Sequence, residues 1–583
     1  MKKVFIALIS GILMGLTPAP VEAWYLAWVA LIPLWILIII TKKVREKLII
    51  SCAWGFGYHG LALFWITGIH PMTWMGVPWL ASVAIAFFCW LFLTFWGAAL
   101  VMVWGVGMSL FYPPQPPLCK GGSYPPQNPV KITPPLDKGG LGGVILRVII
   151  GVAIWCGLEG LWSAGDLWWS SLSYTQSPHN LAILQLLKLS GPSTITAAIV
   201  GINGLIAEGC LLIYKNNLGK YLILNAILIL IGLHLIGLWM YNRPINIMSN
   251  PPQPPEDRGE LEWVTPPLTK GGQGGVTPPL SKGGQGGDKP IKVGIIQGNI
   301  PNEIKLYDEG WRKAIEGYTE GFYTLAKEGV EIILTPETAL PFYWDELVNS
   351  NNSFYEAIKK TGVSAWVGAY GRKGSSYKNS LFTVTGTGET FSQYDKIKLV
   401  PLGEYIPFEK VLGKIIERLS PLDAHLARGE KNQVLDTPFG RVIVGICYES
   451  VFSQHFRRQA KLGGEFIITA SNNAHYSDTM PAQHHAQDVM RAIETDRWAV
   501  RATNTGYSAI VDPHGRTIWI SQINHYEIHA DTIYGRETKT LYVRWGDWLT
   551  PVLLLLAVIS GFLMRKKNPS PEMKPKNERS VKR

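Results

Sequence analysis

Hydrophobic residues are distributed very unevenly along this chain. Seven long apolar runs fill most of its N-terminal part, and an eighth lies close to the C-terminus. A bilayer core takes about 20 apolar residues per helix, so the pattern predicts a polytopic α-helical membrane domain with about eight transmembrane helices. The apolar runs are residues 4–16, 24–40, 49–69, 77–112, 144–162, 182–214, 221–241 and 548–564.

The first apolar run has a second interpretation. Lys2 and Lys3 precede it, and the small-residue segment Val21-Glu22-Ala23 follows it, as in a secretory signal peptide that is later removed. Both interpretations place the chain outside the membrane at this point, so the orientation of the later runs does not depend on the choice.

Basic residues lie on one side of the predicted helices. They follow the second run in segment 42–47, the sixth run at Lys215 and Lys220, and the eighth run at residues 565–567. Basic flanks are typical of the cytoplasmic side of a membrane helix. The sequence therefore predicts a multi-pass protein of the inner (plasma) membrane, with everything between Tyr241 and the last helix on the extracytoplasmic, periplasmic side. Much of the net charge of +11 lies in these flanks, so we expect no nucleic-acid partner.

The polar part of the chain has a different periodicity. Short strand-like runs at residues 293–297, 331–335, 365–369, 380–384 and 466–469 alternate with helical stretches such as residues 311–328 and 481–498. This alternation predicts one α/β domain.

Two Pro/Gly-rich segments interrupt the plan. The pattern Pro-Pro-Leu-x-Lys-Gly-Gly occurs four times within them, and such segments have almost nothing to bury, so we expect disordered inserts without chemistry. The predicted organisation is helices 1–4 in residues 1–112, an insert in 113–143, helices 5–7 in 144–250, an insert in 251–289, the α/β domain in 290–545, the last helix in 546–565 and a basic cytoplasmic tail in 566–583.

Ionisable residues inside or beside the apolar runs allow two interpretations. Glu159, Glu208, His59 and His234 are such residues. An intramembrane carboxylate marks a functional site by default, whereas a hydrogen bond between helices is the structural alternative. Both stay open at this stage.

A single cysteine is the strongest chemical signal in the polar part. Cys447 follows the apolar run 442–446, which predicts a buried strand that leads into a helix. The positive end of a helix favours thiolate over thiol, so we expect a nucleophile. Glu337, also after a strand, would be its general base if burial raises its pKa toward neutrality. Lys396 and the backbone N–H of Tyr448 would stabilise the oxyanion, and we expect neither a metal nor a cofactor.

Three motifs resemble the nitrilase (carbon-nitrogen hydrolase) superfamily. They are Glu337 after a strand, Lys396 ahead of the segment 399–404, which ends in Gly403-Glu404, and Cys447-Tyr448-Glu449. With seven apolar runs before them and one after, the whole chain resembles the apolipoprotein N-acyltransferase family, and the segment 297–301 (Gln-Gly-Asn-Ile-Pro) is similar to the start of that family's extracytoplasmic domain.

This resemblance implies both a fold and a site. The α/β domain would be an αββα sandwich, and Glu337, Lys396 and Cys447 would form the catalytic triad. The family lysine precedes the Gly-Glu glutamate by eight residues, which selects Lys396 and not Lys398. The supporting residues would be Asn379, Glu404, Tyr448 and Glu449.

The resemblance also implies a reaction and its partners. Cys447 would take an acyl chain from a membrane phospholipid and pass it to the α-amino group of a diacylglyceryl-modified apolipoprotein, in an enzyme that we expect to be monomeric. The alternatives are a membrane-tethered amidase and an inactive lipid-binding scaffold. Leu306, where the family often has Trp, and the segment 472–476 depart from the family pattern.

Overall fold

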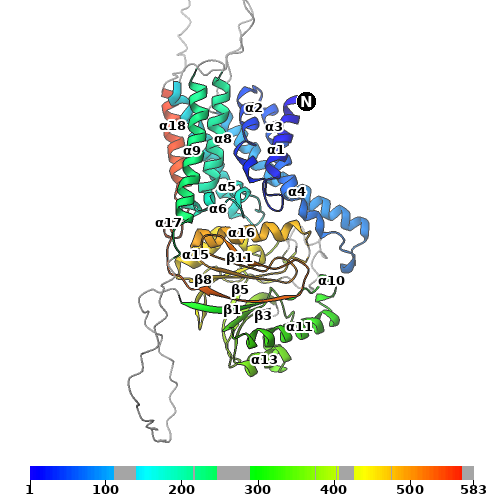
Figure 1. Ribbon diagram of the computed structural model, residues 1–583. Helices are drawn as coiled ribbons and strands as arrows, with labels where there is room; N and C mark the ends of the chain where they lie inside the picture. Colours follow the sequence, from blue (N-terminus) through cyan, green and yellow to red (C-terminus); the bar gives the residue numbers. More distant parts are fainter. Residues whose placement is uncertain are drawn as a thin grey trace, which may run out of the picture.

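The computed structural model consists of a helical bundle stacked on an α/β domain (Figure 1). It describes residues 1–110, 140–213, 217–245, 289–374, 376–401, 403–405, 426–474 and 476–566. Most of the two predicted inserts and the basic tail after Lys566 lie outside the described residues.

The bundle contains the apolar runs. Its helices are α1 (Lys2–Gly15), α2 (Ile32–Ile40), α3 (Val44–Ala62), α4 (Trp79–Leu110), α5 (Gly140–Ala164), α6 (Leu181–Leu184), α7 (Leu187–Ser190), α8 (Pro192–Leu212), α9 (Leu218–Tyr241) and α18 (Leu549–Lys566). By length and composition, α4, α5, α8 and α9 are suited to cross a membrane. The other runs form shorter helices or, in α3, a helix whose first turn carries three charged residues.

The run at residues 182–214 is not the single helix that its composition suggests. The structure divides it into α6, α7 and α8, and the break lies at Gly191, whose φ is +70°. Pro192 follows at the first position of α8, where its missing N–H costs no hydrogen bond. A glycine in the left-handed region therefore ends one helix and a proline begins the next.

The bundle is held together by close helix contacts and by tryptophans. A Cβ at Gly11 of α1 would lie 2.1 Å from the carbonyl oxygen of Trp54 in α3, so α1 and α3 touch backbone to backbone. Trp104 lies between Trp35 and Trp155, with ring centroids 5.4 Å and 5.3 Å away. These large rings fill the centre of the bundle.

The ionisable residues of the bundle have structural partners. Glu159 accepts hydrogen bonds from Trp155, Ser171, Thr196 and the backbone N–H of Leu172. It thereby ties α5 and α8 to the 3₁₀ turn η5 (Leu172–Gln176), which favours the structural interpretation for this carboxylate.

The remaining three ionisable residues are bonded within the same bundle. Glu208 forms an ion pair with Arg147 at 2.8 Å. His59 lies 2.7 Å from the hydroxyl of Ser170, and His234 lies 3.2 Å from the side-chain nitrogen of Asn180.

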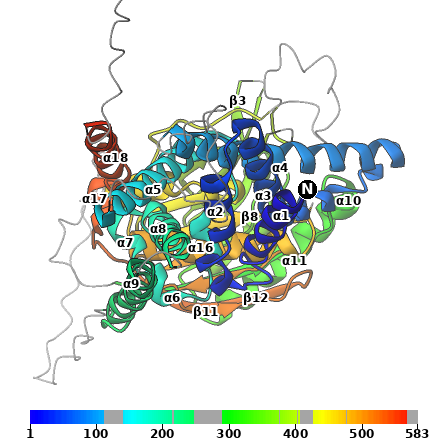
Figure 2. The ribbon, with the colours of Figure 1, turned by 90° about the horizontal axis from the view of Figure 1, so that it is seen from above.

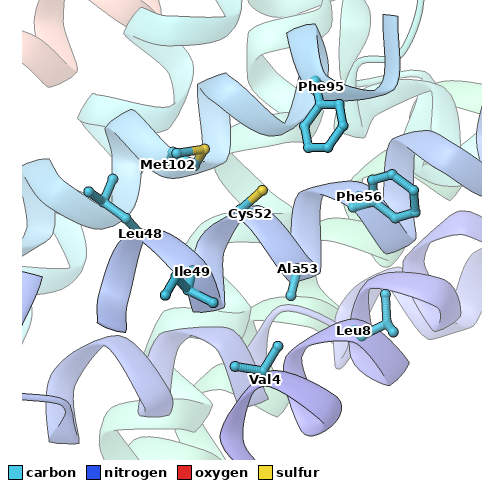
Figure 3. Close-up of a pocket in the computed structure, with 9 residues that line it drawn as sticks. All are labelled: Val4, Leu8, Leu48, Ile49, Cys52, Ala53, Phe56, Phe95 and Met102. Atoms are coloured by element: carbon cyan, nitrogen blue, oxygen red, sulfur yellow. The ribbon is translucent and has the colours of Figure 1, made fainter. Parts of the chain in front are cut away.

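An apolar cavity of about 450 Å³ opens between α1, α3 and α4 (Figure 3). Its lining consists of hydrophobic side chains and the thiol of Cys52. The lining carries no ionisable group besides this thiol, and none of it belongs to the α/β domain, so this cavity has no means of acid–base chemistry.

The α/β domain contains two six-stranded sheets. One has the order β12-β1-β2-β3-β4-β5 and the other has the order β11-β10-β9-β8-β7-β6. The strands are β1 (Pro290–Gln297), β2 (Ile332–Leu334), β3 (Ser364–Lys373), β4 (Ser376–Val384), β5 (Thr390–Asp395), β6 (Leu435–Thr437), β7 (Gly440–Ile446), β8 (Phe466–Ser471), β9 (Ala499–Thr503), β10 (Ala509–Val511), β11 (Thr517–Ile520) and β12 (Glu527–Tyr534).

Alternation along the strands explains the layers. In β7, Val442, Val444 and Ile446 belong to the core between the two sheets, whereas Ile443 joins the core on the helix side. Strand β2 behaves likewise, with Ile333 on its helix side. Each sheet thus buries both faces, and the domain is an αββα sandwich, as the sequence predicted.

Helices cover the outer faces of both sheets (Figure 1). One sheet is covered by α11 (Asp308–Lys327) and α13 (Ser353–Thr361), the other by α15 (Ser453–Lys461) and α16 (Thr479–Thr495). The shorter helices of the domain are α10 (Asn302–Lys305), α12 (Trp344–Asn349) and α17 (Leu541–Trp545).

Helix α16 connects the domain to the bundle. Seen from above, it lies beneath the helices of the bundle (Figure 2). Gln483 of α16 donates to the carbonyl of Ala62 at 2.9 Å and accepts from the indole of Trp169 at 2.8 Å. Ser177 donates to the carbonyl of Ala486 at 2.6 Å. Direct hydrogen bonds therefore join the two parts of the chain.

Candidate active site

Three strand ends bring the predicted triad together. Glu337 follows β2, Lys396 follows β5 directly, and Cys447 follows β7 directly. Strands β1, β2 and β3 are parallel, as are β7, β8 and β9. Side chains at the carboxyl ends of parallel strands share one edge of a sheet, which is where such folds place ligand sites. All three side chains are buried.

Lys396 is the centre of a buried charge network. Its Nζ donates to Glu337 Oε1 and to Glu404 Oε1, both at 2.8 Å. Asn379 donates to the same two oxygens at 2.7 and 3.2 Å. The structure thus places Lys396, and not Lys398, between the two carboxylates. Among the described residues, two of its three N–H groups have acceptors, which leaves one for a substrate.

Cys447 occupies a sharp turn between strand and helix. It begins the 3₁₀ helix η6 (Cys447–Val451) with a φ of +51°, a region that a residue with a side chain enters only when its surroundings enforce it. His484 of α16 donates to its carbonyl at 2.8 Å. The turn lifts the thiol out of the sheet and into the site.

Asn472 links the thiol to the carboxylate. Its carbonyl oxygen lies 3.8 Å from the Sγ of Cys447, and its backbone N–H donates to Glu337 Oε2 at 2.9 Å. This residue follows β8 and opens the segment 472–476, in which His475 lies outside the described residues. Asn472 itself matches the family pattern, so the departures within this segment begin one residue beyond the contact with the thiol.

Two of the supporting residues hold the Cys447 turn in place. Glu449 accepts from the backbone N–H groups of Ile446, Ile397 and Lys398, so it ties the turn to the loop that carries Lys396. Tyr448 bonds instead to the chain between α5 and η5.

The Tyr448 hydroxyl donates to the carbonyl of Asp166 at 2.6 Å, and its ring stacks on Trp169 with 9° between the planes. Both partners lie between α5 and η5, so the residue after the nucleophile touches the chain next to a membrane helix. This contact was not evident in the sequence.

The resting protonation states differ from those that the sequence suggested. Burial, and then the charge of Glu337, raise the pKa of Cys447 to about 12, so the short helix η6 does not favour the thiolate. Burial alone would also raise the pKa of Glu337, but the attraction and hydrogen bond of Lys396 outweigh it and hold that pKa below its ordinary value. Both expectations were wrong, because the site holds a thiol at Cys447 beside a carboxylate at Glu337.

Such a site can move a proton only together with bond formation. A carboxylate of low pKa does not deprotonate a thiol of high pKa by itself, so the proton leaves as the sulfur attacks a carbon. The positive charge of Lys396 then stabilises the negative charge that develops. In the described parts of the chain, no group of three or more His, Cys, Asp or Glu residues is arranged to hold a metal.

Known proteins are similar to this chain over most of its length. The family model described as carbon-nitrogen hydrolase matches residues 292–529, and the model of the apolipoprotein N-acyltransferase N-terminal domain matches residues 10–205. An apolipoprotein N-acyltransferase from Nostoc sp. is 51% identical and covers 94% of this chain and 97% of its own length. The chain belongs to the apolipoprotein N-acyltransferase family.

A second relative agrees with this membership. The apolipoprotein N-acyltransferase from Synechocystis sp. is 46% identical over 94% of this chain and 98% of its own length. Among solved structures, an amidase from Nesterenkonia sp. is 15% identical, with a TM-score of 0.33, over 44% of this chain and 92% of its own. The predicted family is confirmed by the relatives.

A second lysine that sequence reasoning missed lies in this candidate site. Lys305, at the end of α10, is 6% exposed and donates to the carbonyl of Glu337 at 3.2 Å and to the hydroxyl of Thr338 at 3.0 Å. It stands in the polar segment 302–308, where a lysine is typical of a surface. Leu306, the other departure from the family pattern, is its neighbour in sequence.

Lys305 gives the site a pH dependence. Burial lowers its pKa from 10.5 to about 8, against the opposing pull of Glu337 and Cys447. We therefore expect acylation of Cys447 to slow as the pH rises through about 8, because the developing negative charge then loses a nearby cation. Lys305→Met should acylate more slowly at pH 7 and lose this limb of the rate–pH profile. Lys313→Met, in an exposed ion pair with Glu309, is the matched control.

The pH dependence of stability distinguishes this loss of acylation rate from unfolding of the protein. Between pH 8 and 10.5 the folded protein binds fewer protons at Lys305 than the unfolded chain does, so the contribution of this residue to stability rises with pH. The rate should fall while the folded fraction does not. An unchanged alkaline limb in Lys305→Met would contradict the assignment.

Proposed function

We propose that this protein transfers a fatty acyl chain from a membrane phospholipid to the α-amino group of the N-terminal S-diacylglyceryl-cysteine of apolipoproteins. The proposal rests on the buried Glu337–Lys396–Cys447 site, which lies next to the segment that follows α5 of the helical bundle. Membership of the apolipoprotein N-acyltransferase family supports the reaction type.

The first half-reaction acylates the enzyme. Cys447 Sγ attacks the ester carbonyl carbon of the phospholipid while its proton passes to Glu337. The free N–H of Lys396 and the backbone N–H of Tyr448 stabilise the oxyanion. The C–O bond then breaks, Glu337 returns the proton to the leaving oxygen, and a lysophospholipid departs from a Cys447 thioester.

The second half-reaction releases the product. The α-amino group of the apolipoprotein attacks the thioester carbonyl, and Glu337 accepts the proton that the amine loses. The C–S bond breaks and the sulfur recovers its proton from Glu337. Asn379 and Glu404 act as positioning residues: Asn379 donates to Glu337 and to Glu404, and Glu404 accepts from Lys396. Tyr448 and Glu449 position the nucleophile.

We also propose the eight-span topology, with residues 290–545 as an extracytoplasmic catalytic domain of a multi-pass inner-membrane protein. Lys3 donates to Thr41 at 3.1 Å, so the basic residues at the N-terminus and in segment 42–47 meet at one end of the bundle. The N-terminus lies at the end remote from the α/β domain (Figure 1). Basic residues mark the cytoplasmic side, which supports the opposite side for the catalytic domain.

Reporter fusions check this orientation. Fusions after Lys220 and after Lys289 should report opposite compartments, because one proposed span separates them. The fusion after Lys220 should be cytoplasmic. The same compartment at both positions would contradict the eight-span topology while leaving the chemistry of the site untouched.

A membrane-tethered amidase is the second candidate, because the carbon-nitrogen hydrolase model matches the catalytic domain. The two differ in what discharges the thioester. Protein that has been acylated by phospholipid should transfer the acyl group to the amine of a diacylglyceryl-cysteine peptide, as mass spectrometry of the peptide will show. An N-acetylated peptide is the matched control. Release mainly as free fatty acid would favour the hydrolase.

A further inference from the structure

A second charged cluster lies where the bundle meets the α/β domain. Asp166, between α5 and η5, accepts hydrogen bonds from Lys398 at 3.0 Å, from the Tyr405 hydroxyl at 2.9 Å and from Arg428 at 2.9 Å. We call these four residues the Asp166 cluster. The side chains of Asp166 and Lys398 are both 26% exposed and that of Arg428 is 41% exposed, so solvent reaches the cluster.

The cluster lies next to the nucleophile. Lys398 is two residues from Lys396, and its backbone N–H is held by Glu449 at 3.0 Å. The hydroxyl of Tyr448, which follows Cys447, donates to the backbone carbonyl of Asp166. One tyrosine side chain therefore spans the distance from the Cys447 turn to Asp166.

The cations of the cluster differ from those inside the site. Lys396 and Lys305 are buried and held by the catalytic carboxylate and its backbone. Lys398 and Arg428 are partly exposed, and aromatic rings support them: Lys398 Nζ lies 4.5 Å from the ring centre of Phe452, and the Arg428 guanidinium lies 4.5 Å from that of Tyr405. They are thus preorganised and accessible to an incoming anion.

The chemistry of the acyl donor requires an anion near this place. In a glycerophospholipid only a few covalent bonds separate the phosphorus from the ester carbonyl carbon that Cys447 attacks. When that carbon lies at the thiol, the phosphodiester must lie close by, on the side from which lipid enters. Asp166 follows α5, an apolar helix suited to cross a membrane, so the cluster is on that side.

We propose that Lys398, Arg428 and Tyr405 bind the phosphodiester of the acyl donor, and that the Asp166 carboxylate occupies the same donors until the lipid arrives. The inference rests on the proposed function. Arginine and lysine form charge-assisted hydrogen bonds to phosphate oxygens as they do to carboxylates. Exchange of one anion for the other leaves the two cations paired throughout.

Neutralising the cations tests the proposal. Full-length protein in nanodiscs is acylated with phosphatidylethanolamine or with a diacylglycerol of the same acyl chains, and the adduct on Cys447 is followed by mass. In K398Q and R428Q the half-saturating concentration of phosphatidylethanolamine should rise about tenfold to a hundredfold, the effect of one lost charged hydrogen bond. Saturation by diacylglycerol should not change.

Matched variants exclude a general effect. R441Q removes a cation from an exposed pair with Asp436 at the opposite end of β7 and should behave as wild type with both donors. K398R should restore phosphatidylethanolamine saturation. An equal loss with both donors in K398Q and R428Q, or no change with either, would overturn the proposal.

Asp166→Asn should change the half-saturating concentration of phosphatidylethanolamine in the opposite direction. If Asp166 competes with the phosphodiester, the variant should saturate at a lower phosphatidylethanolamine concentration. If the cluster only holds the bundle and the α/β domain together, the variant should lose acylation with both donors, which would overturn the proposal.

Inorganic phosphate distinguishes a site for any phosphate from a site for a lipid phosphate alone. Competitive inhibition of wild type but not of R428Q indicates that the cluster binds any phosphate. The absence of inhibition indicates that it binds only the phosphate of a lipid. The absence of an adduct with either donor in wild type would contradict the proposed function itself.

Discussion

Cys447→Ala is expected to abolish the acyl-enzyme completely. Wild-type protein incubated with phospholipid and no amine acceptor should gain one fatty-acyl mass on Cys447, and hydroxylamine should remove it, because a thioester is labile to this nucleophile. Without the sulfur no covalent intermediate can form, and a site of this type retains little of its rate. Intact-mass and peptide-level mass spectrometry measure the adduct directly.

The other thiols of the chain provide the control for this experiment. Cys52 lines the apolar cavity of Figure 3, whose lining includes no carboxylate and no lysine, and Cys52→Ala should acylate as wild type does. Alanine at position 447 must also adopt a positive φ, so the folded state of the variant should be checked by its thermal unfolding. An adduct that persists in Cys447→Ala would remove the basis of the proposed mechanism.

Lys396→Met is expected to slow acylation by about 10²–10³, the usual cost of removing one charged donor from a developing oxyanion. The structure adds a second reason. Lys396 lies between Glu337 and Glu404, and without it these two carboxylates, which share Asn379, would repel each other. The pKa of one of them would rise, and the general base would be partly protonated.

Glu337→Gln should slow the same step to a similar extent, because an amide cannot accept the thiol proton. Lys396 is bonded to Glu337, and the backbone of Asn472 connects Glu337 to Cys447, so the Lys396/Glu337 double variant should be little slower than either single variant. Lys359→Met, in a surface pair with Glu356, serves as the control. Single-turnover acylation at saturating phospholipid measures the rates. Additive losses in the double variant would contradict a single catalytic unit.

Local pattern was sufficient for the framework of this protein. The short apolar run at 442–446 predicted β7, and the change from apolar runs to strand-like runs near residue 291 predicted the α/β domain. These signals depend on residues two to four positions apart, which is the range over which a strand or helix fixes the direction of a side chain. The eight-residue spacing from Lys396 to Glu404 selected the lysine that the structure places between the two carboxylates.

Local pattern failed where backbone conformation overrides composition. The run at residues 182–214 is apolar enough for one helix, yet Gly191 and Pro192 divide it, and the preceding short helices α6 and α7 lie against the α/β domain and α9. A glycine and a proline within an apolar run mark a helix boundary, and this signal was available in the sequence.

By itself the sequence determined the order of the elements, the family and the identity of the three residues that the strand ends bring together. Only the tertiary structure decided their protonation: Cys447 is a thiol and Glu337 a carboxylate because burial and Lys396 act on them from segments far away in the chain. It also decided that Lys305 donates to the carbonyl of Glu337 and that Asp166 accepts from Lys398 and Arg428. Electric fields and desolvation depend on distances in space, which periodicity does not encode.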